Sequence, residues 1–136
     1  MKNILAVLCL SLAAAATALA HHSFAAEFDA RKIQTIKGTV TEFQWMNPHA
    51  YIYVNAPDAS GKIVNWGIQS RNLSILKRQG WAKNTLKVGE EITVEFFHHK
   101  EEGKNIGFAR YIQKADGTKY DVIPGGEGGI VAPSKP

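Results

Sequence analysis

The fold is decided by one stretch of the chain, TIKGTVTEFQWM at residues 35–46. Its apolar residues change phase partway, because Ile36 and Val40 fall on one face of an extended strand and Phe43 falls on the other. An extra residue in the strand produces such a change, so we expect a β-bulge near residues 41–42. A long bent first strand is typical of a small barrel, where it must pair with neighbours on both sides.

The rest of the chain supplies further strands and one helix. The segments with strand-like alternation are residues 49–55, 62–69, 91–99 and 106–114. A helix is predicted from about Arg71 to Gln79, with Ser70 as its N-cap and Gly80 as its stop. This order predicts a mainly β domain, a small OB-fold-like five-stranded Greek-key barrel with one short helix between strands 3 and 4. A six-stranded sandwich, with the N-terminal arm as an extra strand, is the alternative.

Residues 1–20 resemble a secretory signal peptide in their physical pattern. Lys2 precedes the apolar run 4–12, and the segment ends on the small-x-small triplet Ala18-Leu19-Ala20. The run is shorter than the roughly 20 residues that cross a bilayer, so we expect cleavage and no membrane span after processing. The predicted location is periplasmic or secreted.

The processed chain is expected to contain one domain. We predict an arm at 21–34, an OB-like domain at 35–121 and a disordered Gly- and Pro-rich tail at 122–136. The single cysteine, Cys9, lies in the leader, which leaves no disulfide. Without Lys2 the 16 basic residues fall to 15 against 12 acidic ones, a net charge of +3. These charges are dispersed, which argues against a nucleic-acid partner.

Four short motifs carry a resemblance to a known family. They are HHSF at 21–24, WMNPH at 45–49, VNW at 64–66, and GW at 80–81 before LKVG at 86–89. Together they resemble a family of small exported bacterial proteins of unknown function, with His-His-Ser-Phe after the signal peptide and an Asn-Pro-His motif. The resemblance implies export and the fold over about residues 21–121, and it implies no activity.

Histidines are the first candidate site. All five lie in the processed chain, and the candidate metal ligands are His21, His22, His49, His98 and His99. If cleavage follows Ala20, the free amine and imidazole of His21 can chelate one metal, an arrangement that favours copper(II) when further imidazoles complete the square. Strand alternation sends His98 and His99 to opposite faces. Alternatively, all five are solvated or hydrogen-bonded groups without a ligand.

The Asn47-Pro48-His49 turn has two interpretations. Held rigidly by Pro48, His49 is well placed for a ligand or a metal. Equally, Asn47 caps the turn with its side chain while His49 bonds a backbone carbonyl.

The outer face of the second and third strands is the second candidate site. Alternation places Tyr51, Tyr53, Asn65 and Gln69 there. OB-folds bind oligomers on this surface with aromatic rings as platforms, which suggests a glycan, a peptide or a partner protein. In the alternative, Tyr51 and Tyr53 cover a second small core under the arm.

Catalysis has little support in the sequence. No serine lies in a nucleophile elbow, and no glycine-rich phosphate loop precedes a helix. We therefore expect a non-enzymatic binding or accessory module in the periplasm. Its site is either a histidine-held metal ion, copper favoured, or the metal-free Tyr51 and Tyr53 face.

Overall fold

Strands dominate residues 24–123, the part of the chain that the computed structural model describes. In chain order the elements are β1 (Phe28–Gln44), β2 (Tyr51–Pro57), β3 (Ile63–Gln69), α2 (Leu73–Arg78), β4 (Glu91–His99), β5 (Ile106–Lys114) and β6 (Lys119–Asp121). A helical turn at 24–27 precedes β1. The mainly β prediction is confirmed. The predicted signal peptide and residues 124–136 of the predicted tail lie outside the described residues.

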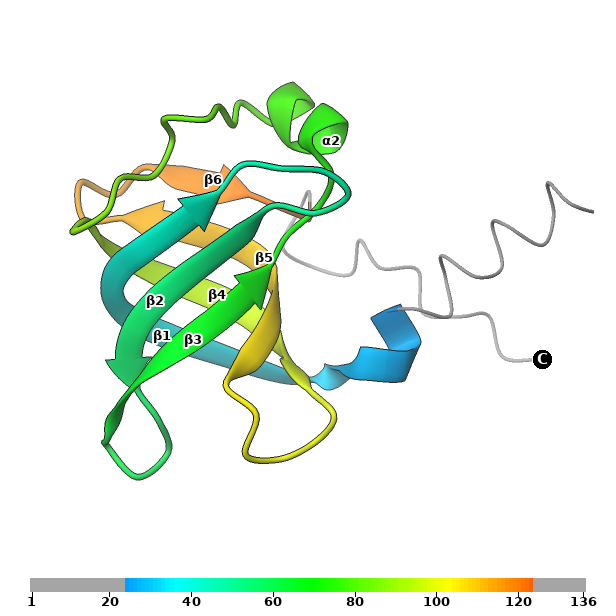
Figure 1. The fold of residues 1–136 in the computed structure, drawn as a ribbon, viewed down its shortest axis with the longest axis vertical. Helices are drawn as coiled ribbons and strands as arrows, with labels where there is room; N and C mark the ends of the chain where they lie inside the picture. The colour runs from blue at the N-terminus through cyan, green and yellow to red at the C-terminus, as the bar shows by residue number, and fades with distance from the viewer. Residues whose placement is uncertain (1–23, 124–136) are drawn as a thin grey trace, which may run out of the picture.

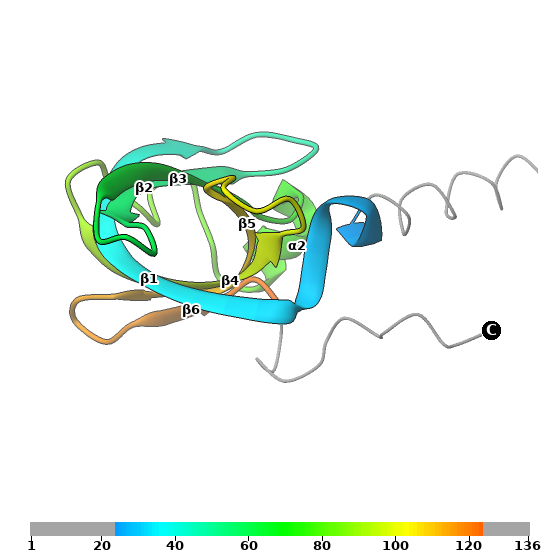
Figure 2. The same cartoon turned by 90° about the horizontal axis from the view of Figure 1, so that it is seen from below.

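The strands form one sheet in the order β3-β2-β1-β4-β5-β6. β3 also pairs with β5, in parallel, so the hydrogen-bonded order returns to β3 after five strands. Seen from below, these strands curve around a shared interior (Figure 2). The buried side chains of these strands form the core of the domain.

β1 is bent as predicted. Its register with β2 shifts between Val40 and Glu42, which confirms the expected bulge. The first half of β1 pairs with β4 and the second half with β2, and Thr39 takes part in both ladders. At Gly38 a Cβ atom would lie 2.1 Å from the backbone oxygen of Asn55. Only glycine fits where β1 passes from one partner to the other.

The core follows the predicted alternation. In β3, Trp66 and Ile68 are buried at 2% and 0% exposure, whereas Ile63 is 60% exposed. The fully buried large side chains come from every strand of the closed order and from α2, and they include Val40, Ile52, Ile68, Leu76, Ile92, Phe96 and Ile112. The inward assignment of strand 3 is thus correct.

Several boundaries differ from the prediction. The second strand was expected at 49–55 and the third at 62–69, whereas β2 is Tyr51–Pro57 and β3 is Ile63–Gln69. β1 begins at Phe28, so residues 28–34 are strand and not arm. Their alternation is hidden because they are mostly polar. The sixth strand is β6, after β5, and not the N-terminal arm. Val122 and Ile123, assigned to the tail, are buried at 0% and 2% exposure and belong to the domain.

The helix start also needs correction. The N-cap of α2 is Asn72, whose side chain accepts the N–H of Ile75 at 3.0 Å. Ser70 was expected there, but its N–H is donated to the Ala50 carbonyl, which extends the pairing between β2 and β3 by one residue. The helix can begin only after that pairing ends.

The two ends of the strands are different. α2 lies at one end, beside the loop 45–50, and the loops 58–62 and 100–105 lie at the other (Figure 1). We call these the α2 end and the loop end. Within residues 24–123, no helix has the length and apolar character needed to cross a membrane.

Candidate functional site

His49 is half-buried in the loop at the α2 end. Its Nδ1 lies 3.0 Å from the Ser70 carbonyl oxygen. Because a carbonyl only accepts, Nδ1 carries the proton and Nε2 keeps its lone pair. A ring fixed in this way is the usual state of a histidine that binds a metal through Nε2.

The side chain of Asn47 was predicted to cap its own turn, but it bonds the start of α2 instead. Its Oδ1 accepts the backbone N–H of Leu73, at the start of α2, at 3.0 Å. The Asn47–Pro48 peptide bond is cis. The Asn47 bond joins the β1–β2 loop to α2. The predicted bond between His49 and a backbone carbonyl is present, with Ser70 as the partner.

The rings of His98 and His99 carry their proton on different nitrogens. His98 donates from Nδ1 to the His99 carbonyl oxygen at 2.6 Å, so its Nε2 has the lone pair. His99 accepts the N–H of Glu101 on Nδ1 at 3.0 Å, so its proton is on Nε2. The His98 ring contacts Trp66, and the His99 ring contacts Phe28. Of the two, only His98 offers its outer nitrogen to a metal.

The histidines of the described residues do not form one cluster. His49 belongs to the α2 end, whereas His98 and His99 lead into the loop 100–105 at the other end (Figure 1). Among residues 24–123 there is no group of three or more His, Cys, Asp or Glu side chains that could hold a metal ion. His21 and His22 lie outside the described residues, so a site that uses them stays a prediction.

The second candidate site is the outer face of β2 and β3. The Tyr51 and Tyr53 rings are stacked, with centroids 6.4 Å apart and an interplanar angle of 22°. Gln69 is directly opposite Tyr51, and Gly67 is opposite Tyr53. Burial is the main cause that raises the pKa of Tyr51, followed by the nearby charges of Tyr53 and Glu27. The structure thus gathers Tyr51, Tyr53 and Gln69 on one face.

Asn65 lies further along the same face, but its amide is already engaged. It donates to Thr41 Oγ1 and to Asn55 Oδ1, both at 2.9 Å. Both amide hydrogens are therefore used inside the protein. Asn65 fixes the bulge to β2 and β3, and only its oxygen remains for a ligand.

The small core under the N-terminal segment is built from phenylalanines and not from the two tyrosines. Phe24 contacts Phe28, Phe97 and Phe108 at centroid distances of 5.3–5.6 Å. The Lys100 side chain also binds the Ala25 carbonyl. Tyr51 and Tyr53 are consequently not required to cover that core.

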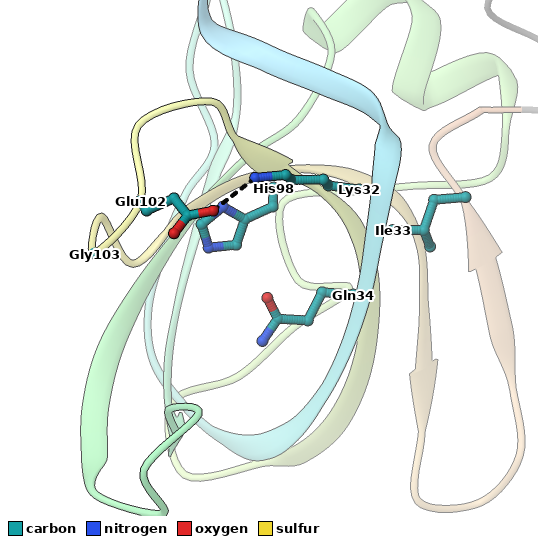
Figure 3. Close-up of a pocket in the computed structure, with 6 residues that line it drawn as sticks. All are labelled: Lys32, Ile33, Gln34, His98, Glu102 and Gly103. Carbon is teal, nitrogen blue, oxygen red and sulfur yellow. Dashed lines mark hydrogen bonds and ion pairs between the residues drawn. The ribbon is translucent and has the colours of Figure 1, made fainter.

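A third site, which the sequence reasoning missed, is a hollow of about 430 Å³ at the loop end. Its lining residues are Lys32, Ile33, Gln34, His98, Glu102 and Gly103 (Figure 3). Gln34 and His98 point to the same side of β1, whereas Ile33 points away (Figure 3). Lys32 Nζ and Glu102 Oε1 form an ion pair at 2.9 Å. We call this hollow the loop-end pocket.

One signal in the sequence could have revealed this pocket. Lys32 and Gln34 have the same alternation as Ile36, which is buried, so a strand beginning before residue 35 would place polar groups at inward positions. Polar residues in an inward row indicate a functional or solvated end.

Comparisons with known proteins give one result. Neither the curated proteins nor the solved structures yielded a match to this chain. One family model, described as a family of unknown function, matches residues 7–109. The match covers more than half of the chain and most of the six-stranded sheet described above. The chain therefore belongs to the family of unknown function DUF6152.

Proposed function

We propose that this protein is an exported, non-enzymatic binding module whose outer β2–β3 face binds an uncharged glycan. The stacked pair of Tyr51 and Tyr53 carries the proposal. Two parallel rings on one strand offer an apolar platform, and sugars expose apolar C–H faces between their hydroxyl groups. Glycan binding through aromatic platforms is a recurrent use of OB-folds.

Support for an OB-fold barrel comes from the strand pairing. β1 pairs with both β2 and β4, and β3 pairs in parallel with β5. α2 lies between β3 and β4 in the chain. These are the features expected of a five-stranded Greek-key barrel, to which β6 adds a short strand at the edge of β5.

The border of the face favours a neutral ligand. Gln44 and Glu42 are opposite Tyr51 and Tyr53 on the β1 side, and Gln69 is opposite Tyr51 on the β3 side. Amide and carboxylate groups of this kind bind hydroxyls, whereas the negative charge of Glu42 repels a polyanion. A sugar or a peptidoglycan fragment fits this border better than a nucleic acid.

Gly67 keeps the platform open toward β5. A Cβ atom at this position would lie 3.5 Å from Cε1 of Tyr53, so the tyrosine ring extends over the bare backbone of Gly67. Beyond it, Ile106 pairs with Gly67 and is 39% exposed. The outer face thus continues from β2 across β3 to β5.

A titration with an N-acetylglucosamine tetramer tests the proposal. The protein is isolated from cells that express the whole chain, and its intact mass is expected to correspond to a start at His21. Tyr53→Ala is expected to weaken binding by about tenfold, roughly 1.4 kcal/mol, because one ring of the platform is lost. Tyr111→Ala, which removes a half-buried tyrosine from β5, is the matched control and is expected to bind normally. Equal binding by both variants would refute the platform.

Copper binding is a second candidate function, favoured by the position of the proton on the His49 ring. The Nδ1–H of His49 is held by the Ser70 carbonyl, which leaves Nε2 for a metal. The expected further ligands are the amine and imidazole of His21. One extra residue before His21 is expected to weaken copper(II) binding by about tenfold, since the chelate ring is lost. Equal affinity with and without the extra residue would exclude the chelate.

A further inference from the structure

The charged side chains of the domain are unevenly distributed. Residues 71–87 contain five basic residues and no acidic residue, whereas the other residues of 24–123 contain nine basic and eleven acidic ones. Only two of the five are adjacent in the sequence, so the positive charge looks dispersed along the chain. We call these five residues the α2 basic surface: Arg71, Lys77, Arg78, Lys83 and Lys87.

The fold places this surface at the α2 end. Lys77 and Arg78 lie in the last turn of α2. The segment that carries Lys83 and Lys87 runs from α2 along this end of the strands to β4 (Figure 1). These four side chains are exposed, whereas Leu76 of α2 is fully buried in the core. One continuous segment therefore presents its cations to the solvent and its apolar side chains to the domain.

The fold supplies no counter-charge for this surface. The six ion pairs found among residues 24–123 all use other basic residues. Of the acidic residues that follow in the chain, Glu90 binds Lys114 at 3.0 Å and Glu91 borders a hollow together with Lys37. A helix dipole favours the two cations in the last turn of α2, but this reason does not extend to the lysines beyond the helix. The segment thus keeps positive charge that the fold itself does not use.

Exposed apolar side chains accompany the cations. Met46, in the loop 45–50, is 48% exposed, and its neighbour Asn47 bonds the N–H of Leu73 at the start of α2. Val88 directly follows Lys87 and is 72% exposed. Basic residues with exposed apolar neighbours are typical of proteins that lie on a membrane, where the apolar groups enter the layer between headgroups and acyl chains.

The shape of the α2 basic surface favours a membrane over a small anion. Neither the loop-end pocket nor the hollow beside Lys37 is lined by any of its five cations. A small ligand needs a concave site in which polar groups converge. A layer of anionic headgroups, in contrast, meets spread cations one by one, and each Lys or Arg near it contributes separately to binding.

We propose that the α2 basic surface binds the anionic headgroups of a lipid bilayer and holds the domain on a membrane. Its cations contact headgroup phosphates, while Met46 and Val88 enter the headgroup layer. In this orientation the loop end, at the opposite end of the strands, is directed away from the bilayer (Figure 1). The proposal does not rest on glycan binding by the outer β2–β3 face.

Flotation with lipid vesicles tests the proposal. The protein is isolated from cells that express the whole chain, and material with the intact mass of a chain that starts at His21 is used. The anionic vesicles contain phosphatidylcholine with about 30% phosphatidylglycerol, and the neutral vesicles contain phosphatidylcholine alone. We expect binding to the anionic vesicles at about 50 mM salt, weakened by about tenfold or more at about 500 mM salt. No binding to the neutral vesicles is expected.

Two double variants with the same loss of charge locate the surface. Lys77→Gln/Arg78→Gln removes two cations from α2, whereas Lys37→Gln/Lys62→Gln removes two exposed lysines from β1 and from the loop end. The first variant is expected to weaken vesicle binding by about 30-fold, and the second by less than about threefold. The thermal transition of each variant checks that it is folded.

A second pair of variants tests the apolar contribution. Val88→Ser is expected to weaken vesicle binding by about fivefold, because it removes an apolar side chain from the headgroup layer. Ile63→Ser, which changes an equally exposed class of residue at the loop end, is the matched control and is expected to bind normally.

Three results would overturn the proposal. Equal weakening in the two double variants would show attraction by net charge without a defined surface. Equal binding to neutral and anionic vesicles would show that the cations do not matter. Absence of binding to the anionic vesicles at low salt would exclude a membrane, and polyglutamate binding that Lys77→Gln/Arg78→Gln abolishes would then assign an acidic protein partner. Tyr53→Ala, on the outer face, is expected to bind vesicles normally, so this proposal and glycan binding fail separately.

Discussion

Two buried tryptophans show how the ends of the molecule differ. Trp81, at the α2 end, is 3% exposed and donates its indole N–H to the Asp121 carbonyl at 2.8 Å. Trp66, beside the loop-end pocket, is 2% exposed and has no acceptor within residues 24–123. The two indoles are therefore equally buried, but of the two only that of Trp81 is hydrogen-bonded within the described residues.

The packing around each tryptophan extends this contrast. Trp81 contacts Phe43 and Tyr120, and Leu76 of α2 is completely buried nearby in the same core. At the loop end the corresponding cover is Lys32 and Glu102, both exposed. Buried apolar side chains thus pack around Trp81 at the α2 end, whereas an exposed ion pair borders the loop end.

Leu76→Ala is expected to give the largest effect. It removes a fully buried side chain at the α2 end and should lower the free energy of unfolding by about 2–5 kcal/mol. The matched change at the loop end, Ile33→Ala, affects a residue that is 49% exposed and should cost no more than about 0.5 kcal/mol. Urea denaturation measures both. Similar losses would show that the two ends are equally well packed.

Exchange of each tryptophan for phenylalanine isolates the hydrogen bond. Both variants lose the same atoms from a buried ring, but only Trp81→Phe breaks a bond and strands the Asp121 carbonyl. We therefore expect Trp81→Phe to cost about 1 kcal/mol more than Trp66→Phe. The two costs are compared as shifts of the denaturation midpoint, provided that the denaturation curves of both variants have equal slopes. A larger cost for Trp66→Phe would reveal an acceptor for its N–H.

Gln34→Leu is expected to stabilise the protein. Leucine at this inward position extends the apolar interior toward the loop end, which should add about 0.5–1 kcal/mol to the free energy of unfolding. Gln113→Leu, an exposed glutamine on β5, is the control and should add nothing. A destabilised Gln34→Leu protein would mean that the amide contributes to the stability of the fold.

The Lys32–Glu102 ion pair should have the smallest effect. Hydrogen bonding to Lys32 is the main cause that lowers the pKa of Glu102, followed by the Lys32 charge. A lowered pKa stabilises the fold above the unfolded value of about 4.3, and this contribution disappears as pH falls through the folded value. The small difference in melting temperature between wild type and Glu102→Gln should thus be present at about pH 7 and vanish at about pH 3. A difference that persists in acid would point to packing.

The strands with a full apolar row could be predicted from the sequence. β4 and β5 have the expected bounds because Ile92, Val94 and Phe96, and later Ile112, alternate against one core. The start of β1 could not be predicted in this way, because the polar residues Lys32 and Gln34 occupy inward positions of the strand and interrupt the hydrophobic pattern. β6, with three residues, is too short for alternation to be recognised.

The candidate sites were predictable in part for the same reason. Strand alternation correctly placed Tyr51 and Tyr53 together, since both belong to one strand. Asn65 was predicted on the right face, but its engagement with Thr41 depends on the bulge register, which the sequence does not specify. The loop-end pocket combines β1, β4 and the loop 100–105, which only the closed pairing brings together.

The double pairing of β1 has a kinetic consequence. β2 and β3 form a local hairpin, which closes in about 1–10 μs in simple systems. The first half of β1, however, needs β4, since Ile36 pairs with Val94 far along the chain. During synthesis this half of β1 is made before β4, so its backbone hydrogen-bonding groups stay unpaired at first. Pairing over such a long sequence separation is the slow step that limits the folding rate of β-rich domains. We expect the refolding yield to decrease as the protein concentration rises, because the unpaired edge of β1 can pair with a second chain instead.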